Sequence, residues 1–394
     1  MPLIVPELSL VLLVGASGSG KSTFAARHFR PTQVLSSDHY RGVVSDDETD
    51  QSASADAFEA LEFLARKRLE RGRCTVVDAT NTDPQYRKRW VSLAKAYHVL
   101  PVAIVLDVEP SVAIERNASR ADRDFGGHVV RRQSRDLRRS LGHLRTEGFR
   151  YVHVLRGEDA VQDAEISFQR SWSDRRDDTG PFDIIGDIHG CFLELCELLD
   201  ELGYAIGHEG ERFVVTPPAG RRALFLGDLV DRGPASHRVL RLVMDMVEAG
   251  AALCIPGNHE AKLLRWLNGK NVKPSHGLQE TIDQLSGEDQ AFRDRVATFV
   301  DGLVSHLVLD GGRLVVAHAG MRRDLQGRAS GRVREFALYG ETTGETDEFG
   351  LPVRYPWARD YDGQAVVVYG HTPVPTAEWV NRTICIDTGC VFGG

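Results

Sequence analysis

The chain has 394 residues, of which 42% are hydrophobic and 26% are charged. A single hydrophobic core rarely serves a chain of this length, so we expect two or three domains, and the composition excludes a mainly disordered protein. The formal net charge of -8 excludes a protein that coats nucleic acid with a broadly basic surface.

The cysteines and the apolar stretches predict a cytoplasmic protein with no membrane partner. The six cysteines form no CxxC pair, which favours reduced thiols. The apolar N-terminal stretch lacks the positive charge that begins a signal peptide and leads directly into a glycine-rich loop, so we expect a strand there. No stretch of the sequence is long and apolar enough to span a bilayer.

Apolar strands alternate with amphipathic helices in the first part of the chain. Strands are expected at 9–15, 32–37, 74–80 and 100–108, and helices after residue 21, over 55–71 and after residue 84. This order predicts an α/β domain over residues 1–170, built on a parallel sheet with helices on both faces. The polar stretch 171–181, SWSDRRDDTGP, ends in Gly-Pro and is typical of a linker.

A second set of strands predicts another domain over residues 182–394. The expected strands are at 182–187, 223–228, 252–257, 306–320, 365–371 and 383–389, the fourth being a hairpin. Helices are expected between the earlier strands and over 260–301, and the acidic stretch 341–350 is expected to be a loop. Nearly all of these strands end in glycine together with Asp, Asn or His.

The stretch GASGSGKST fits the pattern GxxxxGK[ST] and lies between a strand and a helix, which is the context of a phosphate-binding loop. Its backbone amides would surround phosphate oxygens, Lys21 would reach the outer phosphates and Ser22 would ligate Mg²⁺. We therefore expect ATP or another nucleoside triphosphate, with Mg²⁺, at Gly15, Ser17, Gly18, Ser19, Gly20, Lys21, Ser22 and Thr23.

The next two strands end in residues that suit an acceptor site. Asp38 and Arg41 follow a strand at the sheet edge where ligands of open α/β sheets bind. Asp38 is interpreted as a general base for an acceptor hydroxyl, with a helix cap as the alternative, and Arg41 as a ligand for an acceptor phosphate. Asp78 either supports the Mg²⁺ site or is a turn residue.

Three arginines recur at helical spacing before the glycine pair 126–127. Such charges usually lie on a solvated face. Here Arg116, Arg120 and Arg123 favour a mobile lid that closes over the transferring phosphate and stabilises its charge. The later run RRQSRDLRRS, residues 131–140, is interpreted as a solvated helix face.

Five motifs of the second domain carry metal-binding residue types at strand ends. They are DIH with Asp187 and His189, GDLVDRG with Asp228, Asp231 and Arg232, GNHE with Asn258 and His259, AHAG with His318, and GHT with His371. Loops at one edge of a sheet would bring these groups together. Mixed nitrogen and oxygen ligands suit Mn²⁺, Fe or Zn²⁺ better than Ca²⁺.

The ligand types predict two divalent ions with a shared carboxylate, for which Asp228 is the natural choice. Water activated by the ions would attack phosphorus, His259 would protonate the leaving oxygen, and Arg232 would hold the phosphoryl oxygens. One of the two ions would be completed by Asp187, His189 and His371, and the other by Asn258 and His318. We expect His306 to have a structural role and no part in the metal site.

These motifs resemble two known families. GASGSGKST, SSDHYR and the arginine-rich segment resemble the P-loop polynucleotide kinases, and DIIGDIHGC through GHT resembles the calcineurin-like binuclear metallophosphoesterases. In this order they resemble the bacterial polynucleotide kinase-phosphatases of RNA repair over essentially the whole chain. The resemblance implies a P-loop parallel-sheet kinase domain followed by an α/β-sandwich metallophosphoesterase domain.

The resemblance also implies an activity. It is the healing of RNA or DNA ends, by ATP-dependent phosphorylation of 5′-hydroxyls and removal of 2′,3′-cyclic, 2′- or 3′-phosphates, with Mn²⁺ as the expected phosphatase metal. By the same resemblance Asp38 is the kinase base and Arg41 contacts the acceptor. Asp387, in ICIDTGC, would flank the phosphatase site, although the residues alone also allow a strand-end cap.

The sequence departs from this family at its end. Family members usually continue into an adenylyltransferase ligase domain and are associated with a 3′-terminal RNA 2′-O-methyltransferase. The present chain ends at CVFGG, so we expect the ligase to be missing, through truncation or in a natural short form. The alternatives are a small-metabolite kinase fused to a dinucleotide or protein phosphatase, and a nucleotide-sensing scaffold without enzymatic activity.

Overall fold

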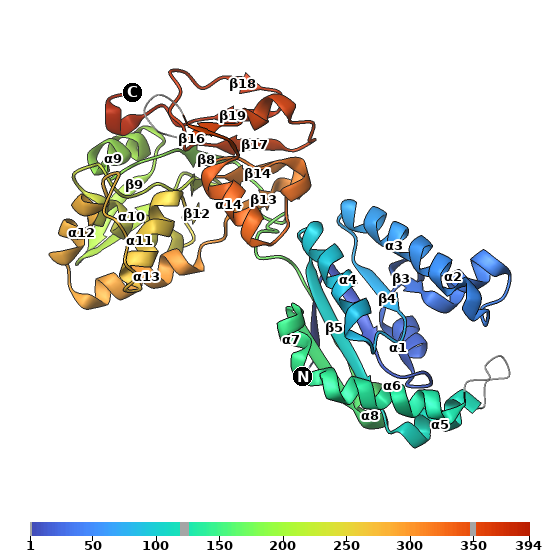
Figure 1. Cartoon of the computed structure of the whole chain (residues 1–394). Helices are drawn as coiled ribbons and strands as arrows, with labels where there is room; N and C mark the ends of the chain where they lie inside the picture. The colour runs from blue at the N-terminus through green and yellow to red at the C-terminus, as the bar shows by residue number, and fades with distance from the viewer. Residues whose placement is uncertain (1, 119–125, 347–351) are drawn as a thin grey trace. The chain divides into compact units, whose positions relative to one another are not determined.

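The computed structural model describes residues 2–118, 126–346 and 352–394 and divides into two compact units. Unit 1 comprises residues 1–171 with 328–330, and unit 2 comprises residues 172–327 with 331–394. Figure 1 shows both units coloured along the chain. Among the described residues, no helix combines the length and the apolar character needed to cross a bilayer.

The stretch predicted as a linker is partly structured. The Val308 N–H donates to the Ser173 carbonyl at 2.8 Å, and the Arg175 N–H donates to the Val308 carbonyl at 2.9 Å. Residues 173–175 are therefore hydrogen-bonded within unit 2.

Unit 1 contains the predicted parallel sheet. Its strands lie in the order β3-β4-β2-β5-β6 and pair in parallel throughout. Because successive side chains of a strand point to opposite faces, Leu10 and Leu12 of β2 pack with Leu61 and Trp90 on one face. Val11 and Leu13 pack with Phe24 on the other face.

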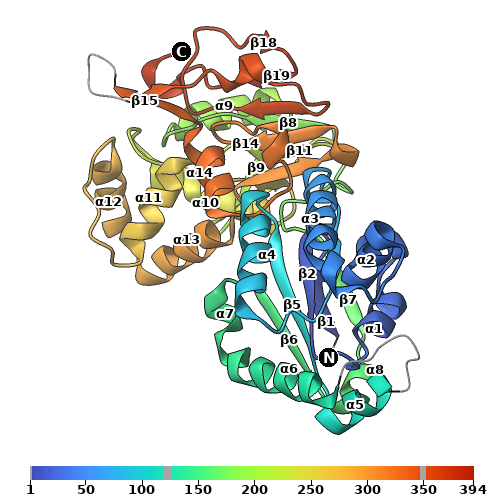
Figure 2. The ribbon, with the colours of Figure 1, turned by 45° about the vertical axis from the view of Figure 1, so that its right-hand side comes forward.

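The helices of unit 1 cover both faces of this sheet (Figure 2). A short parallel pair, β1 (Leu3–Pro6) with β7 (Ile166–Gln169), lies outside it. The sheet strands are β2 (Ser9–Val14), β3 (Val34–Ser36), β4 (Thr75–Asp78), β5 (Leu100–Asp107) and β6 (Tyr151–Arg156). The described helices are α1 (Lys21–His28), α2 (Ser37–Ser45), α3 (Ser54–Glu70), α4 (Pro84–Ala96), α5 (Pro110–Ala118), α6 (Gly127–Ser140), α7 (Leu144–Glu147) and α8 (Gly157–Gln162).

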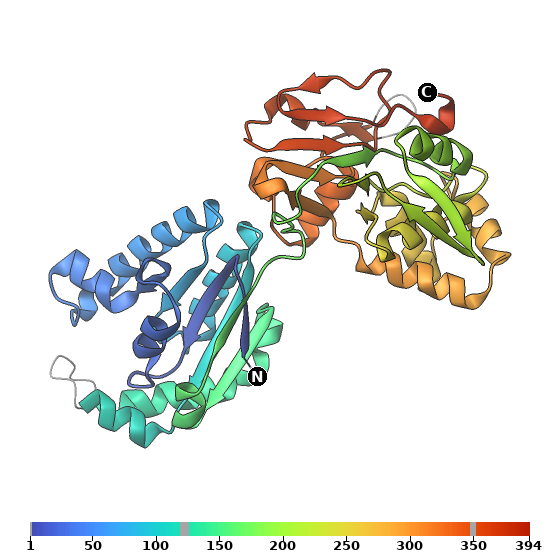
Figure 3. The same cartoon turned by 180° about the vertical axis from the view of Figure 1, so that it is seen from behind.

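Unit 2 is a sandwich of two sheets (Figure 3). The first sheet is parallel, in the order β12-β11-β8, and the second is mixed, in the order β13-β14-β17-β19-β18. Leu224 and Ile255 from the first sheet share one buried cluster with Leu307 and Val316 from the second. The inner faces of the two sheets therefore pack against each other, as their continuous apolar runs require.

Helices cover the outer faces of the sandwich. The strands are β8 (Phe182–Ile185), β11 (Arg222–Phe225), β12 (Ala252–Cys254), β13 (His306–Leu309), β14 (Leu314–Ala317), β17 (Val366–Tyr369), β18 (Trp379–Val380) and β19 (Thr383–Cys385). The helices are α9 (Phe192–Glu201), α10 (Ser236–Glu248), α11 (Asn258–Leu267), α12 (Leu278–Ser286), α13 (Gln290–Gly302) and α14 (Gly331–Tyr339).

Two short strand pairs of unit 2 lie outside the expected elements. The hairpin β9 (Ala205–Glu209) with β10 (Arg212–Thr216) was not predicted. The acidic stretch expected to be a loop instead contributes β15 (Thr342–Thr346), which pairs with β16 (Pro352–Arg354). The alternation in β10 covers only five residues, and β9 and β15 carry few apolar residues, so these pairs give a weak signal for strand prediction.

Candidate functional site

In unit 1 the loop after β2 has the backbone of a phosphate-binding loop. Gly18 and Gly20 have φ values of 81° and 92°, and α1 begins at Lys21. A Cβ atom at Gly18 would lie 2.1 Å from the Ala113 carbonyl oxygen. Only glycine fits this position, because it needs both a left-handed backbone and a close approach to another segment.

The polar atoms of this loop suit an anionic ligand. Lys21 Nζ donates to the carbonyl oxygens of Gly15 and Ala16 at 2.9 and 2.8 Å. The Ser17 N–H donates to Gln133 Oε1 at 2.9 Å. Ser19 Oγ is buried without a hydrogen-bond partner among the described residues. The residues present therefore fit the phosphates of a nucleotide. The Lys21 ammonium would form an ion pair with these phosphates.

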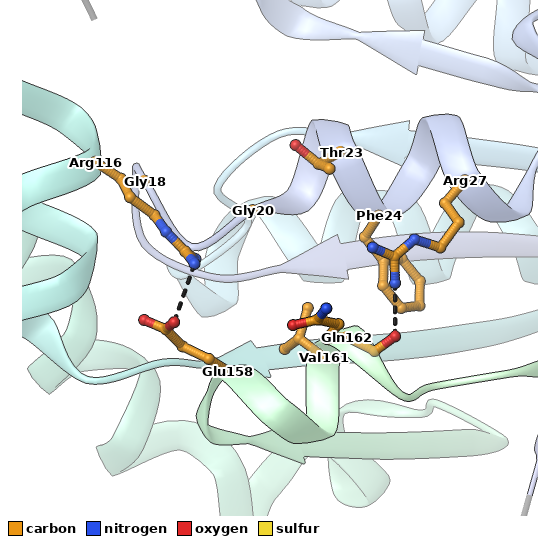
Figure 4. Close-up of a pocket in the computed structure, with 9 residues that line it drawn as sticks. All are labelled: Gly18, Gly20, Thr23, Phe24, Arg27, Arg116, Glu158, Val161 and Gln162. Atoms are coloured by element: carbon orange, nitrogen blue, oxygen red, sulfur yellow. Dashed lines mark hydrogen bonds and ion pairs between the residues drawn. The ribbon is translucent and has the colours of Figure 1, made fainter. Parts of the chain in front are cut away.

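A cleft of about 400 Å³ adjoins the loop (Figure 4). Arg116 lies in it and donates to Glu158 at 3.2 Å. Ser22 and Thr23 are exposed in the first turn of α1. Arg120 and Arg123, predicted with Arg116 as a lid, lie outside the described residues. The cleft is lined by Gly18, Gly20, Thr23, Phe24, Arg27, Arg116, Glu158, Val161 and Gln162.

The predicted acceptor residues lie at the same edge of the sheet. Asp38 is in the first turn of α2, after β3, and forms an ion pair with Arg41. The residue that caps α2 is Ser36, whose side chain accepts from the His39 N–H, so Asp38 is not the cap. Asp78 is buried at the end of β4, between β3 and β2. The carboxyl ends of these three parallel strands therefore bring Asp38, Asp78 and the loop to one edge.

In unit 2 the metal-binding residue types follow the ends of strands from both sheets. Asp187, Asp228 and Asn258 follow β8, β11 and β12, whereas His318, His371 and Asp387 follow β14, β17 and β19. His189, Asp228 and His371 have φ values of 48°, 47° and 75°. Left-handed backbone at non-glycine residues is costly and is concentrated at functional sites.

Asp228 lies at the centre of this cluster. Its Oδ2 atom is 3.7 Å from His189 Nε2, 3.8 Å from His259 Nε2 and 3.4 Å from His318 Nε2. All four side chains are buried. Among the described residues, Asp228 belongs to two groups of converging ligand atoms, one with His189 and His259 and one with His318 and His371. A carboxylate shared in this way is the arrangement expected of a bridge between two cations.

Several ring nitrogens point into the cluster. His189 Nδ1 and His318 Nδ1 lie 2.9 and 3.0 Å from the carbonyl oxygens of Val230 and Leu226, which leaves each Nε2 to face Asp228. His318 Nε2 is also 3.0 Å from both Asn258 Oδ1 and His371 Nδ1. His371 Nε2 is buried with no hydrogen-bond partner among the described residues. This donor set fits divalent cations that take nitrogen and oxygen ligands.

The electrostatics of the cluster also favour a cation. Burial raises the pKa of Asp187 to about 8, because a carboxylate there is poorly solvated. Burial disfavours a charged His318, but the carboxylates of Asp228 and Asp187 outweigh it and raise the pKa of His318 to about 10. Without a bound cation, Asp187 and His318 therefore hold protons that a metal ion would displace.

Asp187 is held at the edge of the cluster by a hydrogen bond from the backbone of His371. The His371 N–H donates to both Asp187 oxygens at 3.2 Å, and a Cβ at Gly370 would lie 2.1 Å from Asp187 Oδ1. Asp387 is 4% exposed and accepts from the Gly389 N–H at 2.9 Å. An added Cβ at Gly370 would also be 3.6 Å from Asp387 Cβ, so the two aspartates flank the same glycine.

Arg232 and His259 lie on the other side of Asp228. Arg232 donates from one guanidinium nitrogen to His189 Nε2 at 2.7 Å, and its second terminal nitrogen is 3.5 Å from His259 Nε2. His259 Nδ1 is 2.5 Å from Asp231 Oδ2. Burial disfavours a protonated His259, but Asp228 and Asp231 outweigh it and raise its pKa. His259 is therefore suited to carry a proton.

Two buried carboxylates of the site have no role assigned from the sequence, although Asp231 is among the motif residues. Asp231 is fully buried, accepts from Thr281 Oγ1 at 2.7 Å and orients His259. Glu260 is fully buried and accepts from three backbone N–H groups, those of Gly257, Asp228 and Leu229. Asp231 belongs to the motif GDLVDRG and Glu260 to the motif GNHE, and membership of these motifs is the sequence signal that could have indicated a role in the site. Sequence spacing does not reveal which acidic residue of such a motif is buried.

Comparison with known proteins gives matches for both units. The family model described as AAA domain matches residues 10–144. The family model described as calcineurin-like phosphoesterase matches residues 180–382, more than half of the chain. These matches confirm the predicted fold class, a P-loop parallel-sheet domain followed by a metallophosphoesterase domain.

Relatives of known name match about half of this chain. An asymmetrical bis(5′-nucleosyl)-tetraphosphatase, PrpE, of Bacillus subtilis strain 168 is 47% identical over 216 residues, which is 54% of this chain and 87% of the relative. The protein of the same name from Geobacillus sp. strain WCH70 is 47% identical over 216 residues, 54% of this chain and 86% of the relative. A protein serine/threonine phosphatase structure from Saccharomyces cerevisiae aligns with TM-score 0.39 and 16% identity, over 55% of this chain and 70% of that chain.

Proposed function

We propose that this chain, which belongs to the calcineurin-like phosphoesterase family, uses unit 2 to hydrolyse a phosphate bond of a nucleotide, with dinucleoside polyphosphates as the substrate class. The observation that carries the proposal is the position of Asp228 Oδ2, within 3.4 to 3.8 Å of Nε2 of three histidines. The substrate class is supported by relatives named as asymmetrical bis(5′-nucleosyl)-tetraphosphatases.

The residues of the cluster would hold two divalent cations, for which we propose Mn²⁺. When bound, the cations would activate a water and neutralise the phosphoryl oxygens. Asp228 would be shared between them. The other ligands would come from Asp187, His189, Asn258, His318 and His371.

Three side chains beside the ligands would then act on the substrate. Arg232 presents its guanidinium at the cluster edge and would bind phosphoryl oxygens, since paired N–H donors match two oxygens. Asp231 holds the imidazole of His259, whose raised pKa keeps a proton available for the leaving oxygen. Asp387 would flank the bound substrate.

The test uses diadenosine tetraphosphate as substrate, with Mn²⁺. We expect ATP and AMP as products, separated by anion-exchange chromatography, and loss of at least about a hundredfold in rate when Asp228→Asn removes the shared charge. Intact substrate after incubation with a protein that releases phosphate from other esters would contradict this substrate class.

A second candidate function is the healing of RNA ends. It is favoured by the Asp38–Arg41 ion pair at the sheet edge that carries the phosphate-binding loop. In this proposal unit 1 binds ATP with Mg²⁺, Lys21 and Arg116 stabilise the transferring phosphate, and Asp38 takes the proton of a 5′-hydroxyl. Unit 2 would then remove 2′,3′-cyclic, 2′- or 3′-phosphates.

An oligoribonucleotide with a 5′-hydroxyl and a 2′,3′-cyclic phosphate distinguishes the two candidates. Transfer of label from γ-³²P-ATP to its 5′ end, lost in Asp38→Asn, together with release of the terminal phosphate, would favour end healing. Label transfer to a small polyol and none to RNA would contradict it and support a small-metabolite kinase in unit 1. The absence of turnover at both sites would support a nucleotide-sensing scaffold.

A further inference from the structure

Phe392 is an exposed aromatic side chain held next to the phosphoesterase site. It ends a short 3₁₀ helix, Cys390–Phe392, and is 68% exposed. A single exposed phenylalanine is common on protein surfaces and by itself indicates no role. What distinguishes Phe392 is the set of contacts that fix its position relative to the cluster around Asp228.

The backbone of this segment is tied to a buried residue of the site. The Gly389 N–H donates to Asp387 Oδ1 at 2.9 Å, and the Phe392 N–H donates to the Gly389 carbonyl at 2.8 Å. Gly389 has a φ of 79°, which lets the chain turn sharply here. The position of Phe392 is therefore set within five residues of Asp387.

A side-chain contact fixes the same segment to the loop that carries His189. The side chain of Cys390 neighbours that of Cys191, and both thiols are free. Cys191 follows His189 by two residues. The 3₁₀ helix is thus attached to two of the loops that form the site.

The ring of Phe392 packs on the side chain that would bind phosphate. The guanidinium carbon of Arg232 is 5.4 Å from the ring centroid, within cation–π range. The same guanidinium donates to His189 Nε2 at 2.7 Å. One side chain therefore separates the ring from the cluster of metal-binding residues, while most of the ring surface remains open to solvent.

We infer that Phe392 is a stacking platform for the nucleobase of the substrate of unit 2. This inference rests on the proposed function and adds a specificity residue to it. In a nucleotide the base lies one ribose ring away from the phosphate. A phosphate bound at Arg232 and the cluster would bring its base within reach of Phe392. Every base has a π-face, so stacking on Phe392 selects nucleotides over baseless phosphates without selecting among the bases.

The test measures inhibition of p-nitrophenyl phosphate hydrolysis by AMP and by ribose 5-phosphate, which differ in the base alone. For the wild type we expect AMP to inhibit about tenfold more tightly than ribose 5-phosphate, as one stacked base would give. Phe392→Ala should bring the two inhibition constants together, and Phe392→Trp should keep them apart. Trp172→Ala, which changes an aromatic residue that is 76% exposed, is the matched control and should keep the wild-type ratio.

The possible failures are distinguishable. If the wild type hydrolyses neither p-nitrophenyl phosphate nor diadenosine tetraphosphate in the presence of Mn²⁺, the proposed phosphoesterase function fails. If either substrate is hydrolysed but AMP and ribose 5-phosphate inhibit that reaction equally, the proposed function stands and the role of Phe392 is overturned. An unchanged ratio in a folded Phe392→Ala variant, with folding checked by thermal melting, would overturn it as well.

Discussion

Glu260 shows how a single buried side chain shapes the phosphoesterase site. Its carboxylate accepts from the backbone N–H groups of Asp228 and Leu229, in the loop after β11, and of Gly257, in the loop after β12. It thereby fixes the two loops relative to each other and holds Asp228 in its left-handed conformation. Glu260 thus supports the ligands without being one of them.

Replacing Glu260 with Gln should therefore weaken both the fold and the site. The amide would turn an N–H₂ group toward a backbone N–H, so we expect the free energy of unfolding to fall by about 1–3 kcal/mol. Urea denaturation followed by circular dichroism measures this change. Glu280→Gln, at an exposed position in α12, is the control and should stay within about 0.5 kcal/mol of the wild type.

His306 makes the free energy of unfolding of unit 2 depend on pH. It is 1% exposed, and its Nε2 accepts from the Gly327 N–H at 2.9 Å, so the folded state holds the neutral ring. Burial lowers the pKa of His306 from 6.5 to about 4. These contacts agree with the structural role expected for His306 from the sequence.

As pH falls from about 6.5 to about 4, unfolding takes up a proton at His306. The stability contributed by the neutral ring is therefore complete above pH 6.5 and is lost across this window, by up to roughly 3 kcal/mol. His306→Gln should flatten the pH dependence of the urea midpoint between pH 6.5 and 4. The exposed His208→Gln should leave it unchanged, and equal slopes for the wild type and His306→Gln would contradict the prediction.

At the scale of elements, the ends of strands determine the geometry of the site. Gly370 directly follows β17. Its φ lies outside the left-handed region, so the lack of space for a side chain, and not the backbone conformation, requires glycine there. A methyl group at this position would meet Asp187 Oδ1. The close approach of this strand end to Asp187 is therefore part of the site.

Gly370→Ala should displace Asp187 or the His371 backbone and lower phosphoesterase activity by at least about tenfold, because small misplacements of catalytic groups are costly. Metal content measured by mass spectrometry should fall in parallel. Gly302→Ala is the matched control, since an added Cβ at Gly302 has no neighbour within 4 Å. Wild-type activity in Gly370→Ala would show that Asp187 can shift without consequence.

The same elements show what the sequence could predict. Long apolar strands followed by glycine and a polar residue, such as the one ending at Asp228, were predicted because their pattern is local. The role of Asp231 and the position of Phe392 were not, because the contacts that define them join segments far apart in the chain. The hairpin β9–β10 was missed because the alternation of buried and exposed residues in β10 covers only five residues and β9 carries little apolar signal.

At the scale of the whole molecule, the chain carries two sites on two separate units. Lys21 belongs to the loop of unit 1 and Asp228 to the cluster of unit 2. We expect Lys21→Ala to reduce ATP-dependent phosphate transfer by at least about a hundredfold and to leave phosphoester hydrolysis unchanged, because removing the charge affects only the phosphates held nearby. Parallel assays of both reactions on one preparation measure this, and a matching loss of hydrolysis would contradict it.

The proposed metal ligands of unit 2 follow strands of both halves of its sandwich, Asp187, Asp228 and Asn258 in the first sheet and His318 and His371 in the second. A cation bound by both sets would join the sheets as a cross-link does. Amide hydrogen exchange would then slow in β11 and in β17 together when metal is added, since neither sheet could open without releasing the ion. Metal occupancy would in this way set the lifetime of the folded sandwich as well as its chemistry.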